Sequence, residues 1–327
     1  MTAPGAWIVT DGKAGDEMQC IAVAEALGLA FELRRVAPRA PWSWAMPRGP
    51  IDPREAPDRP QSPIAPPFPD IAIASGRRAV AYLKRIRRDS HGHTFTVFLK
   101  DPRTGAKAAD FIWVPAHDAL RGDNVLATPG GPHRHSAARL ADARQNPWPQ
   151  IAGLGHPRVA VLVGGNSRNH HYRPEDIARF ADGLRHFIAD GAHLMMTTSR
   201  RTPQALSETL RQIAARGGHL LWDGSGENPL LQYLANADAV VATADSANMV
   251  GEALASGRAV HVFHPQGGHR KFDAFMAGLV GTNALHPFPG PLKVTTYEPV
   301  DSTPEIAEAI RRRFEAHRTA RAPAPRG

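Results

Sequence analysis

The sequence predicts an α/β protein with two Rossmann-like, doubly wound lobes. Its 327 residues suit about two domains, and short apolar runs alternate with helical patterns along most of the chain. Polar or glycine-rich loops follow several apolar runs, and in a doubly wound sheet such loops lie at the carboxyl ends of the strands, where ligands bind. We expect the first lobe at 1–150, the second at 151–300, and a helix with a basic tail at 301–327.

The first lobe has strand and helix patterns on either side of a proline-rich segment. From Pro38 to Pro69 this segment holds 11 of the 30 prolines, and because proline removes a backbone donor and fixes φ, we expect an extended surface loop there. The sequence Asn146–Pro149 marks the linker between the lobes. Strands are expected at Trp7–Val9, Phe31–Val36, Ile71–Ala74, Thr94–Leu99, Phe111–Val114 and Val125–Thr128, and helices at Glu17–Leu27 and Arg77–Arg88.

The second lobe alternates more regularly, as expected of a parallel sheet with crossover helices. Strands are expected at Arg158–Val163, His193–Thr197, His219–Trp222, Ala239–Thr243 and Val260–Phe263, and helices at Pro174–Ala189, Pro203–Ala215, Pro229–Leu234 and Ala247–Ser256. A terminal amphipathic helix is expected at Glu305–His317, followed by a basic tail at Thr319–Gly327.

Composition excludes several classes of protein. The hydrophobic share of 42% and the charged share of 21% are typical of a globular chain with a core. No run approaches the roughly 18 apolar residues of a membrane-spanning helix, and the first residues lack the pattern of a secretion signal. The single cysteine, Cys20, cannot form an internal disulfide or a cysteine-based zinc site. These features predict a cytoplasmic protein.

The formal charge of +8 favours an anionic partner: a nucleotide diphosphate, an anionic membrane surface or nucleic acid. Aromatic residues make up 7% and do not interleave with the basic residues, so we expect no nucleic-acid partner. The helix at 77–88 is strongly basic, and its cations form either a solvated face or a contact with anionic lipid headgroups, peripherally on the inner membrane. These cations are Arg77, Arg78, Lys84, Arg85, Arg87 and Arg88.

Paired glycines follow the first strand of the second lobe. In the sequence Gly164-Gly165-Asn166-Ser167 the glycines would let the backbone approach a phosphate within hydrogen-bond reach. A tight turn from strand to helix would explain the same residues. No Gly-Lys-Ser/Thr follows, so this is not a Walker loop.

The segment 243–257 is the most informative part of the sequence. Either Ser246 or Asp245 can cap the helix that follows, whose free N–H groups and dipole favour an anion. Glu252 is a carboxylate on a helix made mostly of Ala, Leu, Met and Val, where burial is costly unless hydroxyl groups, such as those of a ribose, donate to it. The alternative is a Glu at the helix edge that pairs with Arg258.

A third loop, after the strand at 193–197, places Ser199 and two arginines at the same edge of the sheet. Guanidinium groups match phosphate oxygens, so Arg200 and Arg201 suit a diphosphate. The histidine pairs lack cysteines or carboxylates at ligand spacing, and we expect no metal site. These pairs are His91/His93, His133/His135 and His170/His171.

Four motifs in this order resemble the mitochondrial fission factor family, first named from a plant protein and widespread in bacteria. The resemblance covers nearly the whole chain. The motifs are Asp11-Gly12-Lys13-Ala14-Gly15, Gly164-Gly165-Asn166-Ser167, Thr197-Thr198-Ser199-Arg200-Arg201-Thr202-Pro203, and Ala244-Asp245-Ser246-Ala247-Asn248-Met249 with Glu252-Ala253.

The second lobe is also similar to the donor-binding lobe of GT-B glycosyltransferases, particularly the peptidoglycan enzyme that adds N-acetylglucosamine to a lipid-linked acceptor. This resemblance implies a GT-B-like fold and a nucleotide-sugar, UDP-linked, as ligand. It assigns the donor diphosphate to Gly164, Gly165, Asn166 and Ser246, and the ribose to Glu252. We expect further residues of the same nucleotide-sugar site at Ser167, Ser199, Arg200, Asp245 and Asn248. It places sugar contacts in the segment 264–272, at His264 and Gln266.

In the first lobe, the resemblance implies an acceptor-side loop that includes Gly12, Lys13, Gly15 and Gln19. The family pattern has a histidine where this chain has Asp16, and a carboxylate can also act as a base. We therefore expect Asp16, or failing it Asp11, to be the catalytic base. A polar helix entry with acidic residues in its first turn would explain part of the pattern without catalysis.

The function predicted from these features is that of a glycosyltransferase-like protein that binds a nucleotide-sugar between two lobes and transfers the sugar to a lipid-linked or phosphate-bearing acceptor. No Asp-x-Asp metal motif is evident, so we expect no metal or other cofactor. The alternative is a non-catalytic, membrane-associated interaction protein, as the family name implies.

Overall fold

The computed structural model describes residues 5–167, 169–268, 276 and 284–321. The chain forms two compact units: unit 1 contains residues up to Arg134 and from Ser302 onward, and unit 2 runs from His135 to Asp301. The division therefore lies at 134/135, whereas the sequence analysis places it at 150, and the C-terminal helix is part of unit 1. The cause is a helix at 137–145 that the sequence analysis did not identify and that packs within unit 2.

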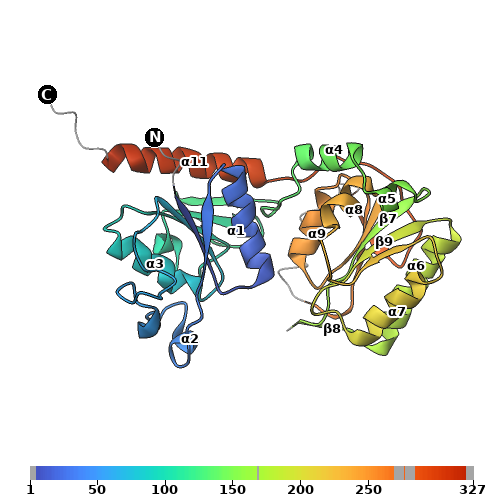
Figure 1. The fold of residues 1–327 in the computed structure, drawn as a ribbon, viewed down its shortest axis with the longest axis horizontal. Helices are drawn as coiled ribbons and strands as arrows, with labels where there is room; N and C mark the ends of the chain where they lie inside the picture. The colour runs from blue at the N-terminus through green and yellow to red at the C-terminus, as the bar shows by residue number, and fades with distance from the viewer. Residues whose placement is uncertain (1–4, 168, 269–275, 277–283, 322–327) are drawn as a thin grey trace. The chain divides into compact units, whose positions relative to one another are not determined.

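Unit 1 is built on one six-stranded parallel sheet in the order β2-β1-β3-β4-β5-β6 (Figure 1). Its strands are β1 (Ala6–Thr10), β2 (Phe31–Arg35), β3 (Ile71–Ser75), β4 (Phe95–Leu99), β5 (Phe111–Pro115) and β6 (Val125–Thr128). Its helices are α1 (Ala14–Ala26), α2 (Trp42–Ala45), η1 (Pro53–Glu55), α3 (Ala79–Asp89), η2 (Ala106–Ala108) and α11 (Thr303–Arg321).

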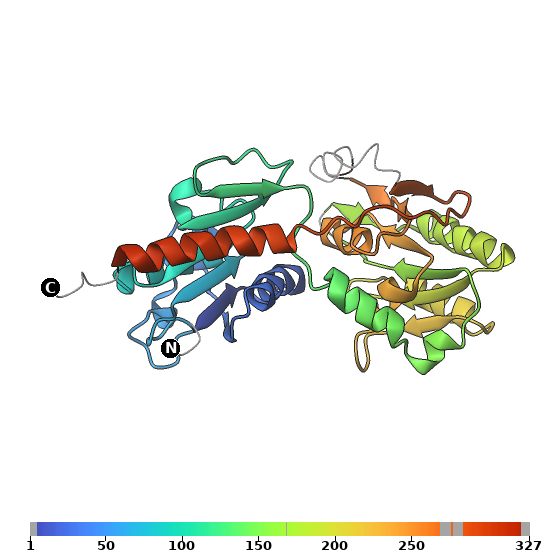
Figure 2. The same cartoon turned by 90° about the horizontal axis from the view of Figure 1, so that it is seen from above.

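Helices cover both faces of this sheet, which explains why its strands β1, β3 and β4 are buried at every position. On one face α1 and α11 lie side by side (Figure 2), and Phe314 of α11 packs on Phe95 with ring centroids 5.7 Å apart. The other face packs against α3, whose buried residues include Tyr82 and Ile86. Successive side chains of a strand point to opposite faces of the sheet, so alternate residues of each strand pack against the two helical layers.

The proline-rich segment differs from the extended surface loop that the sequence predicts. It contains α2 and η1, and its residues Met46, Ile51 and Ile64 are buried in the core beneath α3. The prolines do prevent long regular elements, but the apolar residues between them fill one face of the sheet. This segment is therefore part of the unit 1 core.

Unit 2 is built on a second six-stranded parallel sheet, in the order β10-β9-β7-β11-β12-β14. Its strands are β7 (Arg158–Leu162), β9 (His193–Thr197), β10 (Leu220–Trp222), β11 (Ala239–Thr243), β12 (Val260–Phe263) and β14 (Leu285–Phe288), and β8 (His170–His171) pairs with β13 (Gln266–Gly267). Its helices are α4 (Ala137–Gln145), α5 (Pro149–Ala152), α6 (Pro174–Ala189), α7 (Gln204–Ala214), α8 (Leu230–Asn236) and α9 (Ala247–Leu254).

The two faces of this sheet carry separate cores. One face packs against α6 and α7, around Phe180 and Phe187, and the other packs against α4, α8 and α9, around Leu234 and Val250. These two parallel sheets confirm the predicted α/β class and the two Rossmann-like lobes. The strand β14 was not identified in the sequence.

Each sheet has one point at which the order of its strands reverses. In unit 1 the reversal lies between β1 and β3, and in unit 2 it lies between β7 and β11. Doubly wound sheets bind ligands outside the carboxyl ends of the strands at this point, because the neighbouring loops diverge to opposite faces. The loops after β1, β3, β7 and β11 are therefore the places to look for a site.

Candidate functional site

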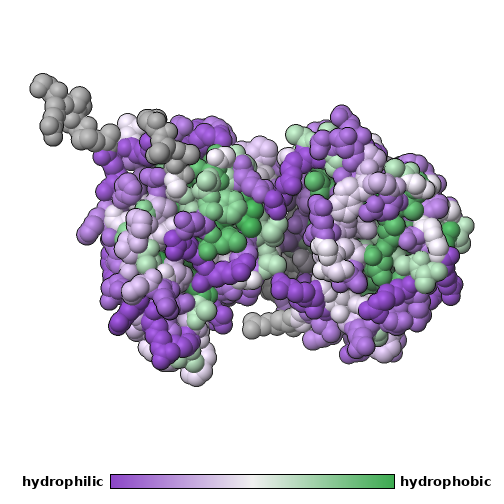
Figure 3. Space-filling model, viewed as in Figure 1, coloured by the Kyte–Doolittle hydropathy of each residue, from purple (hydrophilic) through white to green (hydrophobic). Residues whose placement is uncertain are grey.

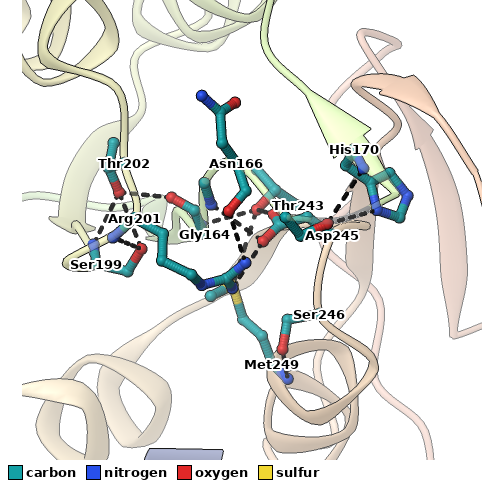
Figure 4. Close-up of polar contacts among 12 residues, drawn as sticks. Gly164, Asn166, His170, Ser199, Arg201, Thr202, Thr243, Asp245, Ser246 and Met249 are labelled. Atoms are coloured by element: carbon teal, nitrogen blue, oxygen red, sulfur yellow. Dashed lines mark hydrogen bonds and ion pairs between the residues drawn. The ribbon is translucent and has the colours of Figure 1, made fainter. Parts of the chain in front are cut away.

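At the reversal in unit 2, the side chain of Asp245 holds three loops together (Figure 4). The carboxylate is fully buried. Oδ1 accepts from the hydroxyl groups of Thr243, at 2.7 Å, and Tyr172, at 3.2 Å. Oδ2 accepts from the Gly165 amide and from the Arg201 guanidinium, both at 3.0 Å. Burial next to this carboxylate raises the pKa of Tyr172, which keeps its hydroxyl group a donor.

The backbone amides of the predicted phosphate cradle all donate to protein acceptors. Gly164 N donates to Thr243 Oγ1 at 2.9 Å and Gly165 N to Asp245. Asn166 N donates to Arg201 O at 3.0 Å, and Ser167 N to His170 O at 2.9 Å. The Ser167 hydroxyl accepts from the amides of the next turn. These four amides therefore close the loop on the protein and present no N–H group to a ligand.

The same packing explains why two glycines stand here. A Cβ at Gly164 would lie 2.2 Å from Asp245 Oδ2, and a Cβ at Gly165 would lie 2.0 Å from the Arg201 carbonyl oxygen. Neither distance is possible for real atoms. The alternative explanation, a tight turn, thus accounts for both glycines without a phosphate.

The start of α9 has the cap that the sequence predicts. Ser246 Oγ accepts from Met249 N at 3.4 Å, so Ser246, and not Asp245, is the capping residue. Helix amides at the first positions lack partners within the helix, and the Ala247 amide has no recorded acceptor among the described residues. Asn248, also predicted in the site, follows on the first turn of α9.

Glu252 lies on α9, six residues after the cap and about 9 Å along the helix axis. It is partly buried, and within the described part of the chain its carboxylate has no hydrogen-bond or ion-pair partner, so the predicted alternative of a pair with Arg258 is absent. Desolvation raises its pKa from the ordinary 4.5 to about 7. Glu252 is therefore a partly buried carboxylate that has no partner among the described residues and lies about one and a half turns from an anion-favouring helix end.

The two arginines after β9 differ. Arg201 donates to Asn166 O at 3.2 Å and to Asp245, whereas the exposed guanidinium of Arg200 has no partner among the residues described. Ser199 belongs to a closed turn in which its amide donates to Thr202 Oγ1 at 2.8 Å. Asn166 accepts through Oδ1 from the Tyr172 amide, which leaves its Nδ2 group available for a ligand.

The segment predicted to contact a sugar lies beside the glycine loop. Gln266 pairs with His171 in the β8–β13 ladder, and its amide donates to Asp176 at 3.1 Å. The backbone carbonyl of the exposed His264 accepts from Arg179 at 2.7 Å. The rest of the predicted segment, 269–272, lies outside the described residues. The structure thus gathers the predicted residues of unit 2 at the carboxyl ends of β7, β9, β11 and β12.

At the reversal in unit 1, the loop after β1 carries the predicted base. Asp16 accepts from Lys100 Nζ at 2.6 Å. Asp11 pairs through Oδ2 with Lys13 at 3.2 Å, and its side chain is 2% exposed. Its other oxygen, Oδ1, is buried and has no hydrogen-bond partner among the residues that the structure describes. Asp11 therefore offers an unoccupied acceptor, while Asp16 is occupied by a cation.

Two residues with positive φ lie next to these carboxylates. Gly76, after β3, has a φ of +94°, and a Cβ there would lie 3.3 Å from Asp16 Oδ2 and 3.4 Å from Asp11 Oδ1. Lys100, after β4, has a φ of +82°, a conformation that is rare for a residue with a side chain. The sequence analysis missed both, although each follows a buried strand. Gly12, Gly15 and Gln19 complete the loop and the first turns of α1, and Gln19 is buried.

Most of the cations on the predicted basic helix are engaged within unit 1. Arg77 donates to the carbonyl groups of Ser43 and Met46, Arg87 pairs with Asp110, and Arg85 and Arg88 pair with Asp89. Arg78 and Lys84 have no partner among the described residues. None of the helices that the structure describes has the length and apolarity needed to cross a bilayer.

An apolar groove of about 470 Å³ lies on unit 2 between α6 and α7, where the surface includes green, apolar areas (Figure 3). Ile177, Ala178, Ala181 and Pro203 are among its lining residues, and no residue predicted for the site lines it. In the described part of the chain, no group of three or more His, Cys, Asp or Glu side chains is placed to hold a metal ion.

A family model described as "Mitochondrial fission ELM1" matches residues 14–314. The chain belongs to this family. The match confirms the resemblance carried by the four motifs.

Two relatives of this family can be aligned with the chain. The mitochondrial fission protein ELM1 of Arabidopsis thaliana is 27% identical over 275 residues, which cover 76% of this chain and 64% of the plant protein. The uncharacterized protein RP120 of Rickettsia prowazekii (strain Madrid E) is 28% identical over 208 residues, which cover 61% of this chain and 54% of that protein. The chain therefore spans less than two thirds of either relative.

Solved structures with this fold include sugar-nucleotide enzymes. The UDP complex of MnaA from S. aureus matches with a TM-score of 0.54 and 12% identity, over 99% of this chain and all of that one. UDP-GlcNAc 2-epimerase from Neisseria meningitidis, bound to UDP-GlcNAc, matches with a TM-score of 0.52 and 10% identity, over 94% of this chain and all of that one. At these identities the similarity establishes the GT-B-like fold.

Proposed function

We propose that unit 2 binds a UDP-linked nucleotide-sugar at its strand reversal, and that the protein transfers the sugar to a lipid-linked or phosphate-bearing acceptor. The observation that carries the proposal is the carboxylate of Glu252, which has a raised pKa and no partner in the described part of the chain. Two ribose hydroxyl groups would supply the donors it lacks. Proteins with the same fold have been solved in complex with UDP and with UDP-GlcNAc, which is why UDP is the first nucleotide to test.

In this proposal the diphosphate lies at the start of α9. The groups available for it are the Ser246 hydroxyl, the Ala247 amide, the Arg200 guanidinium and Asn166 Nδ2. As the bond between sugar and diphosphate breaks, these donors stabilise the charge that develops on the leaving group. The 9 Å between the helix start and Glu252 leaves room for the ribose between them.

Isothermal titration of the whole protein with UDP and with inorganic pyrophosphate tests the donor site. Glu252→Ala should weaken UDP binding by about ten-fold to a hundred-fold, because a charged hydrogen bond to the ribose is lost. Pyrophosphate binding should stay within two-fold, since pyrophosphate has no ribose. Glu175→Ala, which removes an exposed carboxylate from the first turn of α6, is the control and should change neither affinity. Equal losses for both ligands would remove Glu252 from the ribose site, and a parent protein that binds no nucleotide would overturn the donor site itself.

For the acceptor we propose the loop after β1 in unit 1. A base there would take the proton from an acceptor hydroxyl group. Asp16 and Asp11 are the candidates, and Gly12, Lys13, Gly15 and Gln19 shape the loop around them. Asp16 is a candidate base because it stands where the family pattern has a histidine. Asp11 is an equal candidate because its oxygen Oδ1 has no partner among the described residues.

The alternative function is that of a non-catalytic protein that associates with membranes and recruits partners, as the family name suggests. On the basic helix, the cations that could contact a membrane are Arg78 and Lys84, which have no partner among the described residues. The other cations of this helix are bound within unit 1: Arg77, Arg85, Arg87 and Arg88. Flotation with anionic and zwitterionic vesicles distinguishes the two functions. Binding to anionic vesicles alone, reversed by salt and lost in Arg78→Glu, Lys84→Glu, would favour the membrane function.

A further inference from the structure

The carboxylate of Asp245 is surrounded by the kinds of donor that bind a phosphate. Its donors are a glycine amide, a guanidinium and two hydroxyl groups, which are the groups that bind phosphate oxygens in anion sites. A carboxylate fills this cradle from inside the protein (Figure 4). The paired glycines that indicate a phosphate loop in the sequence thus enclose an internal anion.

We infer that the buried side chain of Asp245 excludes the ligand diphosphate from the glycine loop, and that its charge weakens diphosphate binding at α9. The inference rests on the proposed function, and it concerns the same site. If a phosphate displaced Asp245, the carboxylate would remain close to a second anion after losing four donors. That arrangement is costly, because the side chain is fully buried. The diphosphate therefore binds outside the glycine loop.

In this inference the two neighbouring arginines, Arg200 and Arg201, have different roles. Arg201 is a positioning residue: it pairs with Asp245 and holds the loop through Asn166 O. Arg200, which has no partner in the described part of the chain, is the arginine that reaches the diphosphate. The negative charge of Asp245 opposes the ligand, so its removal should tighten binding, which is the reverse of what a ligand-binding residue would show.

The test is titration of the full-length protein with UDP and pyrophosphate, together with the melting temperature of each variant. Asp245→Asn keeps the size and one acceptor oxygen of the side chain but removes its charge, and we expect both ligands to bind about five-fold more tightly. Asp238→Asn is the matched control, since it removes the same charge at the opposite end of β11, and it should leave both affinities within two-fold.

The arginine variants complete the test. Arg200→Ala should weaken both ligands by about ten-fold without a change in melting temperature, and Arg201→Ala should lower the melting temperature because it leaves a buried carboxylate without its cation. Weaker binding in Asp245→Asn at an unchanged melting temperature would overturn the inference, as would loss of ligand binding in a stable Arg201→Ala variant. If the parent protein binds neither ligand, the proposed function fails first. If it binds both and Asp245→Asn does not differ from it, only this inference fails.

Discussion

The two strand reversals have the same topology but differ in how completely their polar groups are satisfied. In unit 2 the glycine loop is closed: each of its amides has an acceptor, and the buried carboxylate has four donors. In unit 1 the corresponding loop leaves Asp11 Oδ1 buried with no partner in the described part of the chain, and Lys100, which pairs with Asp16 of this loop, has a strained backbone. A complete network fixes the shape of a loop, while an incomplete one indicates where a ligand or a proton can be received.

The comparison separates residues that build a site from residues that can act in one. Among the residues described for unit 2, Glu252 has no partner, and it lies away from the glycine loop, on α9. Among those described for unit 1, Asp11 has a buried oxygen without a partner in the loop itself. The groups available for chemistry are therefore on a helix in one unit and in a strand-end loop in the other.

The largest expected effect concerns the base in unit 1. In an assay of sugar transfer, Asp16→Asn should lower kcat by roughly two to four decades with donor affinity nearly unchanged, if Asp16 takes the proton of the acceptor. If Asp16 serves only to pair with Lys100, the loss appears instead in Asp11→Asn. Full turnover in both variants would make the loop structural, and the two reversals would then differ only in packing.

The next effect is on stability and contrasts the glycines of the two reversals. Gly165→Ala should lower the free energy of unfolding by about 3 kcal/mol or more, because its Cβ would meet the rigid backbone of Arg201. Gly76→Ala should cost about 1 to 2 kcal/mol, from its positive φ and a contact with movable carboxylates.

Urea unfolding measures both glycine variants. Gly251→Ala on α9, where a Cβ would meet nothing within 4 Å, is the control and should be neutral or stabilising by up to about 1 kcal/mol. If Gly76→Ala lowered the free energy of unfolding more than Gly165→Ala, the loop of unit 1 would be the more rigid one. That result would contradict the view that the glycine loop of unit 2 is the more completely bonded loop.

The smallest effect is a pH dependence from Glu252. Its pKa is about 7 in the folded protein against an ordinary 4.5, so between these values the folded chain keeps a proton that the unfolded chain has lost. The free energy of unfolding must then fall as pH rises through this interval, by at most about 3 kcal/mol. Glu252→Gln should remove this slope in urea unfolding, and Glu175→Gln should keep it. An identical slope in Glu252→Gln would assign the titration to another group.

The sequence predicted the fold better than it predicted the site. Short apolar runs such as Ile71–Ala74, bounded by polar or glycine residues, are typical of buried parallel strands, and the structure has a strand at this place. Helix α4 was not predicted because few of its residues are buried, so its apolar periodicity is weak. The burial of the proline-rich segment was not predicted because its core residues are isolated between prolines. The pattern of neighbouring residues cannot predict contacts between residues that are far apart in the sequence.

Within the candidate site, helix-capping preferences predict the cap at Ser246, and helix geometry predicts that Glu252 lies on the helix that follows. The structure contains this cap and places Glu252 on α9. The closed glycine loop could not be predicted, because a phosphate cradle and a loop around an internal carboxylate need the same glycines. The acceptors decide between them, and they come from Thr243, Asp245 and Arg201, far away in sequence. For the same reason Lys100 was not identified as the partner of Asp16, 84 positions away.

Helix α11 has a consequence for the order in which the chain is completed during synthesis. Unit 2 is a continuous insertion at residues 135–301, whereas unit 1 needs Ile306, Ile310 and Phe314 to cover one face of its sheet. Ribosomes add about 5 to 20 residues each second, so roughly ten to forty seconds separate the end of the first part of unit 1 from the arrival of α11. During that interval Phe95 and its apolar neighbours on the sheet remain uncovered by α11, and a chaperone that binds nascent chains would find its target on this face.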